Sequence, residues 1–267
     1  MHDDGPEGRC LMAIHSTAII SDGAVLGCNV EIGPYCVIGC NVRIGDDTKL
    51  MSHVVVDGWT TIGRGCTVFP FASLGTQTQD LKFAGGKTFV EIGDKTTLRE
   101  YVTVNSSTNE GEKTVVGAGC HIMAYCHVAH ACVVGKGVIM SNGATLAGHV
   151  IVEDHAIIGG LSAAHQFTRI GRMCMIGGMT RIVQDCPPFM IIEGNPAEVR
   201  GSNSVGLKRR NVSDEAQKSL KESYRILYRE GLSTRQAIDR IKAEVNACQE
   251  VQHLIEFIEA SQRGIIK

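Results

Sequence analysis

Histidine residues are concentrated in one stretch of this chain, between His121 and Ile182. Six of the ten histidines lie there. They are His121, His127, His130, His149, His155 and His165. An imidazole group titrates close to neutral pH, so it can take a proton from an attacking hydroxyl group and pass it to a leaving group. This stretch is therefore the first candidate for acid–base chemistry, and the elements around it must hold the rings in place.

The same stretch carries an apolar residue at every sixth position, and the pattern runs through most of the chain. Its members in the first half are Ile14, Ile20, Leu26, Ile32, Ile38, Ile44, Leu50, Val56, Ile62, Val68 and Leu74. It continues through Ile92, Leu98, Val104, Val116, Ile122, Val128, Val134, Met140, Leu146, Val152, Ile158, Ala164, Ile170, Ile176 and Ile182. This period fits neither an amphipathic helix nor a simple alternating strand. It predicts short parallel strands stacked coil on coil, with one inward residue on each side of a prism.

Breaks in the period divide the chain into regions. We expect a disordered leader at residues 1–12, a β-helix at 13–192 and a small all-α C-terminal domain at 193–267. Polar segments without the period predict loops at 75–89 and 105–115, and loops on a rigid scaffold often carry binding residues. The prolines that end the period are Pro187, Pro188 and Pro196. Helical spacing predicts helices from Ser213 to about Gly231, from Ser233 or Thr234 to about Ala247, and from about Gln249 to Ala260.

The overall composition excludes several classes of protein. The chain has 267 residues with 26 basic and 28 acidic side chains, and this balance is unlike the basic excess of a nucleic-acid-binding protein. Aromatic residues make up only 5%, so platforms for stacking bases are not expected. We find no apolar run long enough for a membrane span and no apolar core of a secretory signal, so we expect a cytoplasmic protein without stable membrane insertion.

The eleven cysteines follow the repeat rather than the spacing of a disulfide or zinc motif. Seven of them stand four residues after a repeat position, in a column of small residues. They are Cys36, Cys66, Cys120, Cys126, Cys132, Cys174 and Cys186. Free cysteine is a good small buried residue. We therefore predict reduced, buried and unpaired thiols, and no metal site.

The segments QDLKFAGG, VAHACVVG, GATLAGHV, AAHQFTRIG and GLKRR, in this order and ahead of a helical tail, resemble the UDP-N-acetylglucosamine acyltransferases of lipid A biosynthesis. The resemblance covers nearly the whole chain after Met12. It implies a left-handed parallel β-helix built of hexapeptide repeats, whereas ordinary parallel crossovers are right-handed. It also implies transfer of an (R)-3-hydroxyacyl chain from acyl carrier protein to the sugar 3-hydroxyl. The family implies a homotrimer with its site between subunits, and neither a metal nor a bound cofactor.

The resemblance also assigns roles to single residues. His130 corresponds to the general base, and the backbone N–H of Gly148 corresponds to the donor for the oxyanion. These two residues stand three repeats apart, so they should meet on adjacent coils about 5 Å apart. The positions that correspond to substrate contacts are Asp80, Lys82 (to a phosphate), His127, His149, His165, Gln166, Gly178 (measuring acyl length), Asn203 and Arg209 (both to the nucleotide). Gly178 leaves the groove open and favours a longer acyl chain. Basic side chains for docking an acidic carrier protein are Arg169, Arg172, Lys208, Arg209 and Arg210.

The sequence departs from the family pattern in three places, which involve four residues. Many relatives have an acidic residue directly after the catalytic histidine, where this chain has Ala131. Asn105 and Ser106 stand where relatives usually have histidine and arginine, and Val205 stands where some relatives have glutamate. We expect these replacements to remove polar contacts, which would alter the sugar acceptor or weaken nucleotide binding.

Alternative functions fit the same repeat. One is the related N-acyltransferase that acts later in the pathway on an amino-sugar nucleotide, although it normally carries an extra N-terminal domain and the coils here begin by residue 14. A zinc carbonic anhydrase of this fold would need three histidines converging across a trimer. A trimeric scaffold without turnover is a third alternative, because of Ala131. The histidines that we interpret as ordinary surface or structural residues are His2, His15, His53, His121, His155 and His253.

Overall fold

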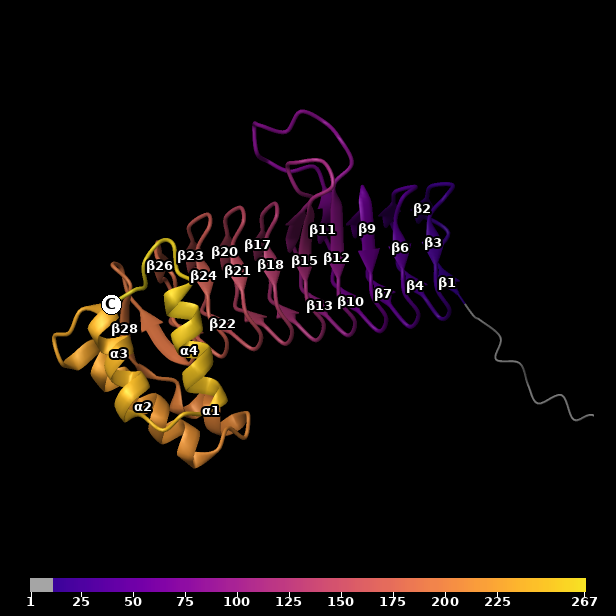
Figure 1. Ribbon diagram of the computed structural model, residues 1–267. Coiled ribbons are helices and arrows are strands. Elements are labelled where there is room, and N and C mark those ends of the chain that lie inside the picture. The colour runs from indigo at the N-terminus through magenta and orange to yellow at the C-terminus, as the bar shows by residue number, and fades with distance from the viewer. Residues whose placement is uncertain (1–11) are drawn as a thin grey trace, which may run out of the picture.

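The computed structural model describes residues 12–267, so all of the expected leader except Met12 lies outside the described residues. The chain forms a long prism of stacked coils with a helical unit at its C-terminal end (Figure 1). Strands at the same level of the repeat pair in parallel, as Ala13 does with Glu31 and Val115 with Val133. The described chain thus has the coiled architecture that the six-residue period predicts.

Three sheets of 11, 9 and 8 strands form the sides of the prism within residues 12–267. The first sheet contains β1 (Ala13–Ile14), β4 (Glu31–Ile32), β7 (Lys49–Leu50), β10 (Thr67–Val68), β13 (Thr97–Leu98), β16 (His121–Ile122), β19 (Ile139–Met140), β22 (Ile157–Ile158), β25 (Met175–Ile176), β27 (Met190–Glu193) and β28 (Glu198–Ser202). The second contains β2 (Ile19–Ile20), β5 (Val37–Ile38), β8 (Val55–Val56), β11 (Ser73–Thr76), β14 (Thr103–Asn105), β17 (His127–Val128), β20 (Thr145–Leu146), β23 (Ala163–Ala164) and β26 (Arg181–Ile182). The third contains β3 (Val25–Leu26), β6 (Arg43–Ile44), β9 (Trp59–Ile62), β12 (Phe89–Ile92), β15 (Lys113–Val116), β18 (Val133–Val134), β21 (Ile151–Val152) and β24 (Arg169–Ile170).

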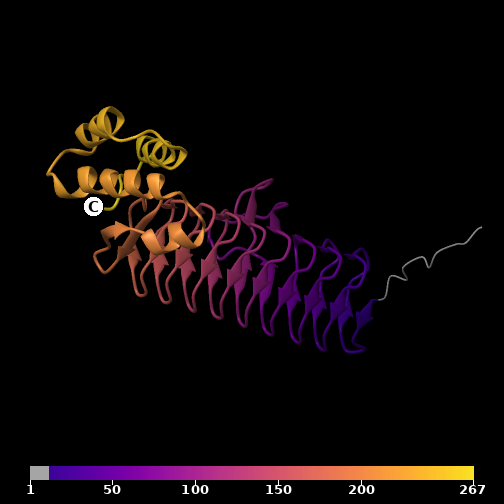
Figure 2. The same cartoon turned by 90° about the horizontal axis from the view of Figure 1, so that it is seen from below.

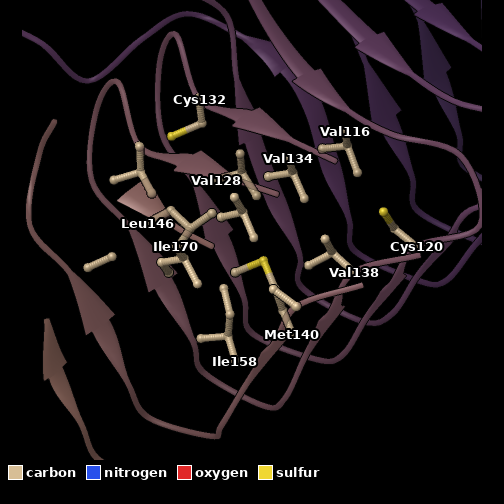
Figure 3. Packing of buried hydrophobic residues seen from close by; sticks show 14 of the residues in the cluster. Val116, Cys120, Val128, Cys132, Val134, Val138, Met140, Leu146, Ile158 and Ile170 are labelled. Carbon is tan, nitrogen blue, oxygen red and sulfur yellow. The ribbon is translucent and has the colours of Figure 1, made fainter. Parts of the chain in front are cut away.

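The core is a set of aliphatic columns inside the prism (Figure 3). The last residue of each short strand points inward, and Leu146, Ile158 and Ile170 are almost completely buried. Each inward residue meets an equivalent residue one coil away, because adjacent strands lie about 4.8 Å apart. Burial of one such side chain contributes about 1.5–3 kcal/mol, so the repeat itself supplies most of the stability of the prism.

The seven cysteines of the small-residue column are buried and unpaired, which confirms the prediction. Five of these thiols donate to backbone carbonyls of the following coil; they belong to Cys36, Cys66, Cys120, Cys126 and Cys132. Cys126 Sγ donates to Ser141 O at 3.1 Å, and Cys132 Sγ donates to Ala147 O at 3.0 Å. Burial raises the pKa of the Cys132 thiol to about 12, so this thiol is not an ionised nucleophile at neutral pH.

The turns between sheets form three corners of the prism. We call them the first corner (first to second sheet), the second corner (second to third sheet) and the third corner (third to first sheet). The third residue of a regular corner often adopts a left-handed backbone conformation, as in Ala131 (φ 54), His149 (φ 59) and Phe167 (φ 65). At such a corner the residue before the left-handed position, such as His130, lies outside the aliphatic core, and the residue after it, such as Cys132, is buried inside the prism.

Two loops leave the second corner, and both project from the same edge of the prism (Figure 1). The first excursion, residues 77–88, runs from β11 to β12, and the second excursion, residues 106–112, runs from β14 to β15. The loops expected at 75–89 and 105–115 are thus shorter, because the flanking strands are extended. β12 and β15 each have four residues and pair along their whole length, from Phe89 with Lys113 to Ile92 with Val116.

The C-terminal region begins with a strand, although the sequence predicts an all-α domain at residues 193–267 whose first helix begins at Ser213. β28 pairs antiparallel with β27 and buries Val199, so it covers the end of the first sheet before the helices begin. The helices are α1 (Ser204–Arg209), α2 (Asp214–Arg229), α3 (Thr234–Glu244) and α4 (Gln249–Glu259). They pack together at the C-terminal end of the prism (Figure 2). In the described chain, no helix combines the length and the apolar character that a membrane span requires.

Local signals explain where these helices begin. Ser213 accepts a hydrogen bond from the Ala216 N–H at the start of α2. Ser233 and Gln236 form a capping box at the start of α3. α1 was not predicted, because it is short and its cap is Asn203 inside a segment without a clear apolar period.

Candidate active site

The second corner collects most of the residues that the sequence selects. His130 lies in the turn from β17 to β18, Gly148 and His149 lie in the next turn along the prism, and His165 and Gln166 lie in the one after that. The two excursions leave this corner on earlier coils. The repeat therefore lines up residues that are far apart in sequence along one edge.

The imidazole of His130 lies directly against Gly148. A Cβ atom added to Gly148 would lie 2.2 Å from both Cε1 and Nε2 of His130, so only glycine leaves room for the ring. The N–H of His149 donates to the carbonyl of His130 at 3.0 Å, which ties the two turns together. The structure thus brings His130 and Gly148 onto adjacent coils, as their spacing predicts.

A carboxylate from the first excursion faces the His130 ring. Asp80 Oδ2 lies 3.9 Å from His130 Nε2, and both side chains are largely buried. The Lys82 N–H donates to Asp80 Oδ1 at 3.0 Å, and the Thr108 hydroxyl donates to Asp80 Oδ2 at 3.3 Å. The hydrogen bond from the Lys82 N–H, followed by the charge of His130, holds the pKa of Asp80 below its usual value. Asp80 is therefore ionised wherever His130 can act.

The environment of His130 favours the neutral ring. Burial, followed by the charge of His149, lowers the pKa of His130, while Asp80 and Glu112 act in the opposite direction. Its Nδ1 atom is buried without a hydrogen-bond partner among the described residues. A neutral imidazole with Nε2 turned toward a carboxylate can accept a proton and hold the resulting charge.

The other three selected histidines have different surroundings. His149 stacks on Phe167 with ring centroids 4.7 Å apart and meets His130 edge to face at 5.1 Å. His127 Nδ1 lies 2.6 Å from the Thr103 hydroxyl on the outer side of the second sheet, and burial lowers its pKa. His165 is exposed, and its Nδ1 lies 3.1 Å from the carbonyl of Gln166. Of these three, only His149 touches the His130 ring.

Several other selected residues lie away from His130 within this chain. Lys82 is exposed in the first excursion. Gly178 lies in the first corner and is exposed. Arg209 is exposed at the end of α1, whereas Asn203 is buried and caps that helix. The Asn203 side chain donates to Met173 O at 2.9 Å and accepts from the Gly206 N–H at 3.0 Å, so it already has structural partners.

The replacements at Asn105 and Ser106 have a structural explanation. Both residues are buried between the two excursions. Asn105 Nδ2 donates to the Thr76 hydroxyl at 3.2 Å, and the Ser106 N–H donates to Thr76 O at 2.9 Å. In this chain they brace the loop that carries Asp80. Val205, the third replacement, is exposed on α1.

Sequence reasoning did not select Thr108, Glu112 or Phe167. Thr108 belongs to a loop without a period, so no sequence pattern places it near His130. Glu112 could have been found, because it stands three repeats before His130 and adjacent coils stack equivalent positions. Phe167 could have been found, because it stands three repeats after His149 and adjacent coils stack equivalent positions.

A groove of about 630 Å³ runs from this corner along the third sheet toward the C-terminal tail. Its lining includes Ala131, His149, Ile151, Phe167, Arg169 and Arg263.

No group of three or more histidine, cysteine, aspartate or glutamate residues in the described part of this single chain is arranged to hold a metal ion. The site that is built within one chain is instead a neutral imidazole, a facing carboxylate and a glycine backbone. These groups suit proton transfer and stabilisation of an oxyanion.

Comparison with known proteins shows to which family this chain belongs. Residues 185–266 match the model described as UDP N-acetylglucosamine O-acyltransferase, domain 2, and residues 113–148 match the bacterial transferase hexapeptide repeats. The acyl-[acyl-carrier-protein]–UDP-N-acetylglucosamine O-acyltransferase of Thermodesulfovibrio yellowstonii is 52% identical over 255 residues, which are 95% of this chain and 99% of that protein. The enzyme of the same name from Verminephrobacter eiseniae is 45% identical, with the same coverage of 95% and 99%.

Solved structures agree. The LpxA structure from Acinetobacter baumannii has a TM-score of 0.92 and 43% identity, covering 95% of this chain and 99% of that one. The UDP-N-acetylglucosamine acyltransferase from Bacteroides fragilis has a TM-score of 0.93 and 40% identity, covering 95% and 100%. The left-handed parallel β-helix predicted from the resemblance is confirmed. The chain belongs to the acyl-[acyl-carrier-protein]–UDP-N-acetylglucosamine O-acyltransferase family.

Proposed function

We propose that this protein transfers an (R)-3-hydroxyacyl chain from acyl carrier protein to the 3-hydroxyl of UDP-N-acetylglucosamine, the first step of lipid A biosynthesis. The names of its relatives supply the donor and the acceptor. The observation that carries the proposal is the neutral His130 ring, packed on Gly148 with Nε2 turned toward Asp80. This is the arrangement that an acyl transfer between a hydroxyl and a thioester requires.

In the proposed step, His130 Nε2 takes the proton of the sugar hydroxyl while the oxygen attacks the thioester carbonyl. The new C–O bond forms and the C–S bond breaks. The proton then passes from the imidazolium to the leaving thiolate of the carrier protein. Asp80 stabilises the imidazolium meanwhile, because opposite charges a few ångströms apart favour the protonated ring.

The backbone of Gly148 is the proposed donor to the oxyanion. Its N–H makes no hydrogen bond to the described residues, although its carbonyl accepts from the Phe167 N–H at 3.2 Å. A fixed and unused N–H beside the base costs no reorganisation when charge develops on the carbonyl oxygen.

A homotrimer is part of the proposal. The outward residues of the second sheet carry no acidic side chain and no lysine or arginine from β2 to β23. They are Ile19, Val37, Val55, Ser73, Thr103, His127, Thr145 and Ala163. The neighbouring first corner exposes a stack of rings, with Phe71 and Tyr101 centroids 5.0 Å apart and Tyr101 and Tyr125 centroids 4.9 Å apart. Contiguous exposed apolar surface of this kind favours contact with another copy.

Such packing accounts for the residues that lie away from His130 in their own chain. We infer that Gly178, Asn203 and Arg209 serve the site of a neighbouring subunit. Gly178 has no side chain to block a groove, which favours a longer acyl chain. Asn203 would act there mainly by fixing α1, on which Arg209 is exposed.

The acyl carrier protein is proposed to dock on the basic residues near the helical unit. Lys208, Arg209 and Arg210 are exposed and suit an acidic partner. Arg169 and Arg172 contribute less to this docking surface, because both arginines are partly buried. Arg169 also forms an ion pair with Glu153 at 3.5 Å. The hydroxyacyl carrier protein is a co-substrate, so the proposed reaction needs no metal or bound cofactor. Reduced thiols suit a cytoplasmic location.

The proposal is tested by incubating the purified protein with hydroxyacyl carrier proteins of several chain lengths and UDP-N-acetylglucosamine. Mass spectrometry should detect an O-acylated UDP-sugar. A parallel reaction with a 3-amino UDP-sugar tests the N-acyl alternative. Lack of product with every chain length and either acceptor would leave the scaffold alternative in its place.

A further inference from the structure

Glu112 is a second carboxylate at this site. It ends the second excursion and directly precedes β15. Val115 of β15 pairs with Val133 of β18, so Glu112 and His130 stand equally far before paired residues of adjacent coils. The Thr114 hydroxyl, two residues after Glu112, accepts a hydrogen bond of 2.9 Å from the Ala131 N–H. The register therefore places Glu112 one coil before His130, on the side opposite to Gly148.

The loop fixes this carboxylate without neutralising it. The Ser107 hydroxyl donates to Glu112 Oε2 at 2.9 Å, and Asn109 Nδ2 donates to Oε1 at 3.1 Å. Ser107 itself is completely buried. No lysine or arginine in residues 12–267 forms an ion pair with Glu112. The Asn109 hydrogen bond first, with further help from Ser107 and from the charge of His149, holds the pKa of Glu112 below its usual value.

His130 has a matching need. Its Nδ1 atom is buried and meets no partner in the described chain, and the next residue, Ala131, offers none. A histidine that becomes an imidazolium during a reaction needs a fixed negative charge nearby. The charged and titratable groups that face it are Asp80 and Glu112, which raise its pKa, and His149, which lowers it. His127 lies close enough for its pKa to be lowered by the charge of His130.

We propose that Glu112 is a positioning residue for the acyl transfer: fixed by Ser107 and Asn109, it supplies a permanent negative charge on the side of His130 remote from Gly148. Asp80 faces Nε2, where the proton arrives. Glu112 lies on the preceding coil, and its negative charge offsets the positive charge that the neighbouring rings of His130 and His149 can carry. The inference rests on the function proposed above. With this role, the second excursion would support the reaction through Glu112, in addition to bracing the first excursion.

The test compares Glu112→Gln with the matched control Glu110→Gln, which removes an exposed carboxylate from the same loop. NMR titration of the His130 ring in the folded protein should show a midpoint lower by about 0.5 pH unit or more in Glu112→Gln, because removal of a nearby negative charge disfavours the imidazolium. The Glu110→Gln midpoint should equal that of the unaltered protein. A merely structural role for Glu112 would not move this midpoint while the fold is intact.

Steady-state kinetics provide a second test of the role of Glu112. In Glu112→Gln, kcat should fall about fivefold to twentyfold while KM changes less than about twofold, and the acid limb should move to lower pH. Adding Ala131→Asp to Glu112→Gln should restore part of kcat, because it returns a carboxylate beside the same ring.

The outcomes separate the two proposals. An unchanged His130 midpoint and an unchanged pH profile in Glu112→Gln, together with inactivity of His130→Ala, would overturn the role of Glu112 and leave the acyl transfer standing. Absence of acyl transfer in the unaltered protein would overturn the function, while the NMR midpoint would still report on Glu112.

Discussion

The second and third corners of the prism share a backbone but differ in what their carboxylates do. In the third corner, Asp46 accepts a hydrogen bond from the Cys28 N–H at 2.8 Å, and Asp154 accepts one from the Lys136 N–H at 2.7 Å. Each of these carboxylates thus satisfies a backbone donor of the preceding coil. In the second corner, Asp80 and Glu112 come from loops outside the repeat, and Asp80 faces the imidazole of His130.

Two histidines make the contrast sharper. His149 and His155 occupy the same left-handed position of their corners, with φ of 59° and 62°. His149 contacts the His130 ring, whereas His155 lies in a corner without an imidazole neighbour or an excursion. The local backbone is thus the same, and the residues on the adjacent coils give the two histidines different surroundings.

The largest expected effect belongs to His130→Ala. It should lower kcat by about 100- to 10,000-fold, the usual contribution of a positioned acid–base group. The thermal midpoint should change little, because the ring lies at a corner outside the aliphatic columns. His155→Ala is the matched control in the third corner and should keep nearly full activity. Equal activity of both variants would end the distinction between the corners.

Gly148→Ala should have the next largest effect. Its Cβ would overlap the His130 ring, so the ring must leave its position or the turn must shift. We expect kcat to fall by about 100-fold, since the proposed base and the proposed oxyanion donor are both displaced. Gly201→Ala is the control, because a Cβ there meets nothing within 4 Å. Steady-state assays of the two variants, with circular dichroism to verify folding, would show whether turnover depends on the close contact between residue 148 and the His130 ring.

Asp80→Ala should have a smaller effect on the same step. Loss of the carboxylate removes one source of imidazolium stabilisation, and we expect kcat to fall about tenfold without loss of folding or of assembly. Size-exclusion chromatography would monitor assembly alongside the kinetics. Kinetics equal to those of the unaltered protein would remove Asp80 from the site and restrict the chemistry to the regular coils.

The smallest expected effect is in the pH dependence of kcat/KM. In the proposed reaction the neutral form of His130 is the base, and burial lowers its pKa from the ordinary value. The value of kcat/KM should therefore fall as pH drops through a midpoint below about 6.5. Asp80 and Glu112 remain ionised across this range, because both pKa values are held below their usual ones. An acid limb centred well above neutrality would contradict the environment assigned to His130.

The sequence alone was sufficient for the regular part of the molecule. One inward residue in six fixes the coils, and the same arithmetic aligns His130 with Gly148 and places Cys132 in a buried column. These predictions depend only on a constant repeat, because identical coils stack identical positions. Helix starts at Ser213 and Ser233 were equally readable, since a cap acts within a few residues.

Only the tertiary structure decided the irregular part. Asp80 reaches the second corner through a loop whose path follows no period, so its approach to His130 could not be counted from the sequence. Asn105 and Ser106 turn inward as braces at the start of the second excursion, and β28 pairs antiparallel inside a domain that was expected to be all-α. A repeat determines position by simple addition along the chain. A loop conformation depends on contacts between residues far apart in sequence, and those contacts exist only after the prism has folded.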